Sequence, residues 1–146
     1  MQKISSFIFI SIALILLIAL PGYCQASDKA FEQLKSELKT EGVSDQFVQI
    51  TENSVKKMIV SKASIIDIKT VLLDLWSEKV SARALKNAVS AVAELVESGD
   101  NVLAAAKITS GAAHKAESEG LGGFGVGMRV KKSVQDRKLY LKTLNK

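Results

Sequence analysis

Ser110, His114 and Glu117 are the residues of this chain whose types and spacing come nearest to a catalytic set. On one helix they would lie at positions i, i+4 and i+7 and could share a face. A nucleophile needs a base held against it and donors for the developing oxyanion, and one straight helix supplies neither. His114 is the only histidine, and a lone His-x-x-Glu pair offers a metal at most two ligands. The sequence therefore predicts no enzyme, no cofactor and no metal site.

A second segment that could bind a ligand is rich in glycine and spans residues 120–127. Backbone amides of such a segment bind phosphate when it connects a strand to a helix. No strand is expected before it, and Met128-Arg129 stands where a phosphate-binding loop needs Lys followed by Ser or Thr. We interpret residues 120–127 as a flexible hinge, and a glycine-softened start of the last helix is the alternative. The hinge residues are Gly122, Gly123, Gly125 and Gly127.

The segment that follows, residues 128–146, is basic and amphipathic. Residues 129–146 include seven basic residues opposed only by Asp136, whereas residues 28–119 carry 12 basic and 14 acidic residues. Helical spacing gathers apolar residues on one side of this segment and cationic residues on the other. The apolar residues are Val126, Val130, Val134, Leu141 and Leu144, and the cationic residues are Arg129, Lys131, Lys132, Lys138 and Lys142.

This charge pattern predicts a binding or interaction protein. A cationic amphipathic helix suits an anionic membrane surface or an acidic partner protein. Its apolar side could instead pack on the rest of the protein, with the lysines facing water. Tyr140 is the only aromatic residue of the segment, so no specific nucleic-acid partner is expected. The alternative function is self-association as a structural protein of the cell envelope, a homo-oligomer paired through the shallow alanine face from Ala104 to Ala113.

The elements that must position these residues are predicted to be helices. Apolar residues recur at helical spacing, and no proline follows Pro21. We expect an all-α bundle of five or six short helices with tight connections, of which residues 27–119 form the main body. Trp76 is expected in the core or between helices. The first helix spans about residues 28–40, and the later ones begin near Ser44, Ser64, Ser81, Asp100 or Asn101, and Val126.

Counted from Ser44, Ser64, Ser81, Asn101 and Leu121, the helix openings are 17 to 20 residues apart, which indicates a recurring unit of one helix and one turn. A bundle with short connections gives the same spacing without any duplication of sequence. Both interpretations remain open at the level of sequence.

Residues 1–26 have the pattern of a secretory signal peptide. Lys3 precedes an apolar stretch that ends at Leu20, and a cleavage site of small residues follows at Ala26. The protein is therefore expected to be exported to the periplasm or beyond. An uncleaved membrane anchor and a lipoprotein signal at Cys24 are the alternatives. Cys24 is the only cysteine, so its removal would leave a mature chain without disulfides.

Overall fold

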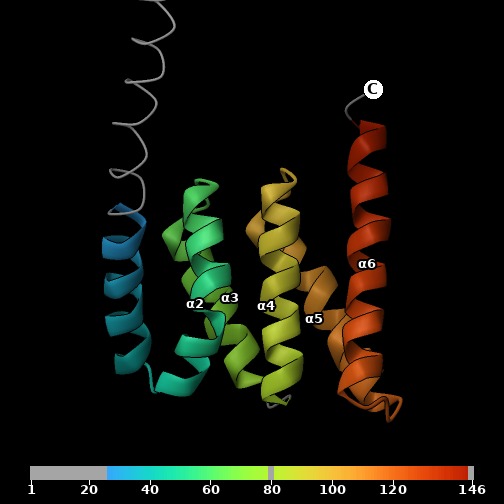
Figure 1. Ribbon diagram of the computed structural model, residues 1–146, viewed down its shortest axis with the longest axis horizontal. Helices are drawn as coiled ribbons and strands as arrows, with labels where there is room; N and C mark the ends of the chain where they lie inside the picture. Colours follow the sequence, from blue (N-terminus) through green and yellow to red (C-terminus); the bar gives the residue numbers. More distant parts are fainter. Residues whose placement is uncertain (1–25, 79–80, 145–146) are drawn as a thin grey trace, which may run out of the picture.

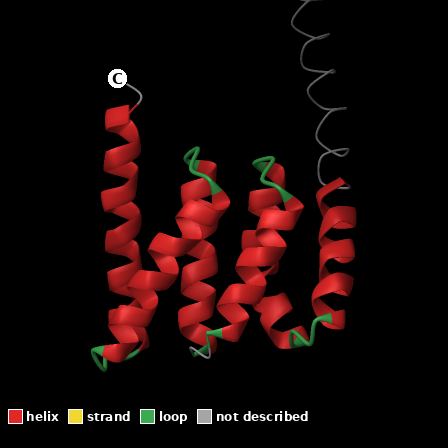
Figure 2. Cartoon of the chain, turned by 180° about the vertical axis from the view of Figure 1, so that it is seen from behind, coloured by secondary structure: helices red, strands yellow, loops and turns green. Residues whose placement is uncertain are grey.

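The computed structural model describes residues 26–78 and 81–144, which form six helices and no strands (Figures 1 and 2). The predicted all-α fold is thereby confirmed for these residues. The export signal predicted for residues 1–26 lies outside them, except for Ala26. In chain order the helices are residues 26–40, α2 (Asp45–Val60), α3 (Ile65–Ser77), α4 (Ala82–Glu97), α5 (Val102–Ser118) and α6 (Gly123–Leu144).

A polar side chain caps the start of each helix from α2 to α5. The Ser44 hydroxyl accepts a hydrogen bond from the Phe47 amide at 3.2 Å, which satisfies one of the free amides of the first turn. The same arrangement recurs at the next three helices, so the predicted helix starts are confirmed. The caps are Ser44, Ser64, Ser81 and Asn101.

Four of the connections use one left-handed turn. At the first of them the Gly42 amide donates to the Lys39 carbonyl and the Val43 amide donates to the Leu38 carbonyl, both at 3.1 Å. This pair of bonds satisfies carbonyls at the helix end and reverses the chain within a few residues. The same pair is present at the other three turns. The residues with positive φ are Gly42, Lys62, Gly99 and Gly120.

Helices that are two apart in the chain lie side by side, which gives two layers. α2, α4 and α6 form one layer, and α3 and α5 pack behind it (Figure 1). The Ser54 and Ser90 hydroxyls join α2 to α4 at 3.1 Å, and Lys138 of α6 donates to Glu94 of α4 at 2.6 Å. The helix of residues 26–40 lies at the opposite end of the row from α6 (Figure 1).

The core is mostly aliphatic, with Phe31 and Phe47 as its aromatic members, and centres on α4, which has nine buried residues. α5 contributes mainly small side chains, among them Ala105, Ala106 and Ala113, which are buried in the same core. Short side chains let α4 and α6 approach α5 closely. The alanine face that suggested self-association therefore has a packing role within the chain. The α4 positions predicted to face inward, all of them buried, are Leu85, Ala88, Val89, Val92, Leu95 and Val96.

In the part of the chain that the structure describes, no helix combines the length and the hydropathy needed to cross a bilayer.

Candidate docking surface

Three valines fix the orientation of α6 about its own axis. Val126, Val130 and Val134 follow one another at intervals of four residues and are 1%, 2% and 2% exposed. They pack into the core between α4 and α5. The apolar side predicted for this helix is confirmed over its first half, whereas Leu141 is partly exposed and Leu144 is 62% exposed. Because the valines hold one side of α6 against the protein, its opposite side faces outward.

The glycine-rich segment differs from the predicted hinge, because α6 already begins at Gly123. Gly123, Gly125 and Gly127 lie in the first turns of the helix, and only Gly122 of the predicted hinge residues precedes it. The Gly122 carbonyl accepts the Val126 amide at 3.0 Å and so belongs to the helix start. The alternative interpretation, a glycine-rich first turn, is the one that agrees with the structure.

The physical reason for two of these glycines is the close passage of α6 past α4. A Cβ atom on Gly123 would lie 2.7 Å from the Cδ atom of Arg83, and one on Gly127 would lie 3.2 Å from the Nδ2 atom of Asn87. Arg83 and Asn87 are one turn apart on α4, as Gly123 and Gly127 are on α6. The glycines therefore make room for two α4 side chains.

The cationic residues predicted on α6 divide into two groups. Arg129 pairs with Glu119 at 2.6 Å, and Lys138 pairs with Glu94 at 2.6 Å. The second group is exposed, and none of its members forms an ion pair within residues 26–78 and 81–144. It consists of Lys131, Lys132 and Lys142.

A further cation of α6, Arg137, holds the second half of the helix to the turn between α4 and α5. Its guanidinium donates two hydrogen bonds to the Asp100 carboxylate, at 2.8 and 2.9 Å. The Asp100 side chain is only 4% exposed. The hydrogen bonds from Arg137 hold the pKa of the Asp100 carboxyl below its usual range, against the opposing effect of burial. This pair therefore keeps α6 docked and takes Arg137 out of the surface available to a ligand.

Large apolar side chains share the outward side of α6 with the unpaired lysines. Phe124 is 82% exposed, Met128 is 54% exposed and Leu139 is 62% exposed. Leu121, in the preceding turn, is 37% exposed. These residues were not among those predicted from the sequence. Their helical spacing places them opposite the buried valines, which is the signal that could have revealed them. We call the following set the outer face of α6: Leu121, Phe124, Met128, Lys131, Lys132, Gln135, Leu139 and Lys142.

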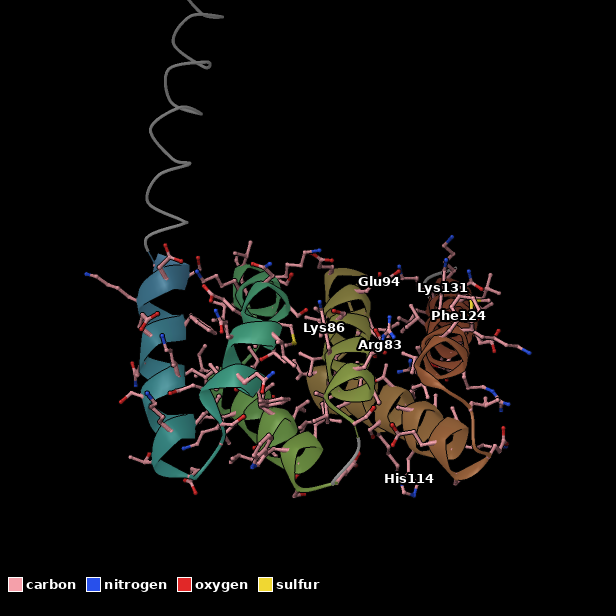
Figure 3. All side chains as sticks on the ribbon, turned by 60° about the horizontal axis from the view of Figure 1, so that its bottom comes forward. Arg83, Lys86, Glu94, His114, Phe124 and Lys131 are labelled. Atoms are coloured by element: carbon pink, nitrogen blue, oxygen red, sulfur yellow. The ribbon has the colours of Figure 1, made fainter. Side chains whose placement is uncertain are left out.

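The first half of this outer face forms a shallow hollow. Apolar and cationic side chains line it together, and Gln135 is its neutral polar member. Figure 3 shows Phe124 and Lys131 on α6, next to α4, which carries Arg83 and Glu94. Arg129 also borders the hollow, where its ion pair with Glu119 compensates that carboxylate. The cations that line the hollow are therefore Arg129, Lys131 and Lys132, and Arg129 alone of the three is paired within the described residues.

The residues first considered for catalysis lie elsewhere. His114 is exposed on α5, away from the outer face of α6 (Figure 3). Glu117 accepts hydrogen bonds from the Ser81 hydroxyl at 2.9 Å and the Ser81 amide at 3.3 Å, which ties α5 to the start of α4. In the described part of the chain, no hydrogen bond joins Ser110, His114 and Glu117. Across residues 26–78 and 81–144, no group of three or more His, Cys, Asp or Glu side chains is placed to hold a metal ion.

Comparison of the chain with protein-family models, with curated proteins and with solved structures found no match. The geometry of this surface is therefore the basis for inferring a function.

Proposed function

We propose that this chain is an exported, non-enzymatic binding protein whose α6 contacts an anionic surface of the cell envelope. The observation that supports this proposal is the outward side of α6, where Lys131 and Lys132 lie beside the exposed Phe124 and Met128 and Lys142 follows further along. Within the described residues, these three lysines are exposed and form no ion pair. Counterion release and apolar burial both favour the binding of such a surface to a polyanion or to anionic lipid. An acidic partner protein is the other occupant with the right charge.

Several lysines outside α6 are compensated by neighbouring carboxylates. Lys56 pairs with both Asp28 and Glu52 at 2.8 Å, and Lys69 pairs with Glu37 at 3.1 Å. Exposed ion pairs of this kind contribute little to stability, but they cancel the local field that would attract an anion. The outer face of α6 keeps its positive field.

The location of the protein is part of the proposal. The export signal predicted for residues 1–26 would bring the helical domain into contact with the envelope, either free after cleavage at Ala26 or still attached to its apolar segment. The mature chain from Ser27 to Lys146 includes every helix from α2 to α6.

The proposal is tested by sedimentation of the mature chain with phosphatidylglycerol or phosphatidylcholine vesicles at low and high salt. A triple variant with Lys131, Lys132 and Lys142 changed to Gln should bind anionic vesicles roughly 100-fold more weakly, since each lysine near an anionic membrane contributes about 1 kcal/mol. Binding by the unchanged protein should fall as salt increases. Equal binding by the variant and the unchanged protein would refute the proposal.

The control is a second triple variant that removes the same charge elsewhere. Lys29, Lys62 and Lys107 are exposed, lie outside α6 and form no ion pair in the described part of the chain. Changing these three to Gln should leave binding within about twofold if the site is local. A loss equal to that of the α6 variant would show that net charge alone drives binding.

Self-association is the second candidate function. The observation in its favour is the exposure of Phe124, Met128 and Leu139 on one side of α6, which a second copy of the chain would cover. Sedimentation-equilibrium ultracentrifugation separates the two candidates, because a monomer at all concentrations would eliminate an assembly role.

A further inference from the structure

We propose that the cluster of Leu121, Phe124 and Met128 at the start of α6 inserts into the interfacial region of an anionic lipid bilayer. We call this cluster the apolar wedge. The inference rests on the proposed function and makes it more specific, since it identifies the anionic surface as lipid and not as an acidic protein.

The side chains of the wedge are exposed to solvent. Phe124 is 82% exposed, so nearly all of its ring faces outward from a helix whose opposite side is buried. Met128 lies one turn further along at 54% exposure, and Leu121 precedes the helix at 37%. Single exposed apolar residues are common on protein surfaces, whereas a contiguous group bordered by cations indicates a contact surface.

Leu121 lies against the first turn of α6. A Cβ atom on Gly125 would lie 3.0 Å from the Cβ atom of Leu121, so the leucine side chain lies over the glycine. Leu121, Gly125 and Phe124 line the same hollow. Gly125 therefore leaves room for Leu121 beside Phe124 and Met128, and the three apolar side chains form one continuous apolar surface.

Two exposed lysines follow the wedge at a spacing of about one helical turn. Lys131 and Lys132 follow Met128 by three and four residues, so they lie about one helical turn beyond it on the same side. A lysine stem covers apolar surface while its ammonium group stays in the polar layer. Apolar side chains at the acyl boundary, with cations one turn away at the phosphates, match the layering of a lipid interface.

The cations and apolar groups of the wedge region favour non-directional contacts over oriented hydrogen bonds. An acidic protein partner is recognised through oriented hydrogen bonds, usually from planar donors such as arginine. Arg129 and Arg137 of α6 are already engaged with Glu119 and Asp100. The wedge region is left with flexible lysines and apolar groups, whose attraction to a surface is non-directional. That chemistry favours lipid over a shaped protein surface.

The experiment places a fluorescent reporter in the wedge. Phe124→Trp is made in a Trp76→Phe background, so that the new indole is the only one in the chain. With phosphatidylglycerol vesicles, its emission should move to shorter wavelength and be quenched by brominated acyl chains. A matched control is Leu103→Trp in the same background, because Leu103 is 45% exposed on α5 and lies outside the wedge. Its emission should not change. Circular dichroism checks that each variant is folded.

A second variant tests whether the wedge contributes to binding. Phe124→Ser combined with Met128→Ser should weaken binding to anionic vesicles roughly tenfold or more, because two large apolar side chains lose their burial. The salt dependence of binding should remain, because the lysines are intact.

The outcomes separate the two proposals. If the protein sediments with vesicles but the emission of the new indole does not shift, binding is by charge alone and the wedge inference is wrong, while the proposed function stands. If nothing sediments with vesicles, the proposed function itself fails. An emission shift that grows with protein concentration without any vesicles would assign the wedge to a second copy of the chain and overturn insertion.

Discussion

Replacement of Arg137 by Met should destabilise the protein by about 2–3 kcal/mol, because a hydrogen bond to a charged group contributes about 1.5–3 kcal/mol and a nearly buried carboxylate loses its partner. Arg137 donates to both carboxylate oxygens of Asp100, at 2.8 and 2.9 Å, and the Asp100 side chain is 4% exposed. The Asn101 amide still donates to Asp100 at 3.0 Å, which limits the loss. Met keeps the apolar stem of Arg137.

The assay is urea unfolding at neutral pH followed by circular dichroism, with Lys138→Met as the matched control. Lys138 also pairs with a carboxylate across to α4, but its side chain is 33% exposed and that of Glu94 is 55% exposed. Because solvent weakens such a pair, the control should lose less than about 1 kcal/mol. Equal losses in the two variants would refute the argument that burial of Asp100 sets the contribution of the pair.

At acid pH, the difference in the free energy of unfolding between the unchanged protein and Arg137→Met should disappear. The pKa of Asp100 is lower in the folded protein than in the unfolded chain, because of its hydrogen bonds with Arg137. The resulting stabilisation is fully present above the unfolded pKa of about 4 and is lost as the pH falls through the folded value. The free energies of unfolding of the two proteins should therefore converge below about pH 4. A difference in unfolding free energy that does not change with pH would contradict the assignment of this stabilisation to ionised Asp100.

Two backbone substitutions should stabilise the protein in the same urea assay. Gly111→Ala should add about 0.5–1 kcal/mol, since Gly111 is inside α5 with nothing within 4 Å of a new Cβ atom. A loss of stability there would show that α5 needs the glycine for packing. Lys62→Gly should add up to about 1 kcal/mol, because Lys62 has a φ of 62° at a turn where the equivalent Gly42 and Gly99 have φ values of 82° and 92°. Unchanged stability would mean that the lysine side chain compensates the backbone strain.

Local sequence patterns were sufficient to predict the helices. A capping serine accepts a hydrogen bond from an amide only three residues away, so the sequence alone predicts the helix start at Ser44. A glycine at a helix end adopts the positive φ itself, so the sequence also predicts the helix end at Gly99. Trp76 was expected in the core or between helices, and its ring packs on Phe47 of α2 with 5.3 Å between centroids, although it remains 37% exposed.

Features that depend on pairs of distant residues could not be predicted in this way. The role of Gly127 depends on Asn87, 40 positions earlier in the sequence, and nothing near the glycine shows that α4 will pass there. In the same way, Lys138 appears free in the sequence but pairs with Glu94. Phe124 could have been placed correctly, because it lies opposite Val126 and Val130 by helical geometry, but the flexible hinge interpretation hid this relation.

The two-layer arrangement makes the protein an array of local contacts. Glu94 and Lys138 bond across 44 residues of chain, and the contacts between α2 and α4 or α3 and α5 join helices that are likewise two apart. Such arrays open unit by unit, with the least protected unit at the end of the row. Among the described helices α4 is enclosed on several sides, whereas α6 has neighbours on one side only. The docking surface therefore lies on the end helix of the row, whose inner side is held to its neighbours by the three buried valines and by the Arg137–Asp100 pair.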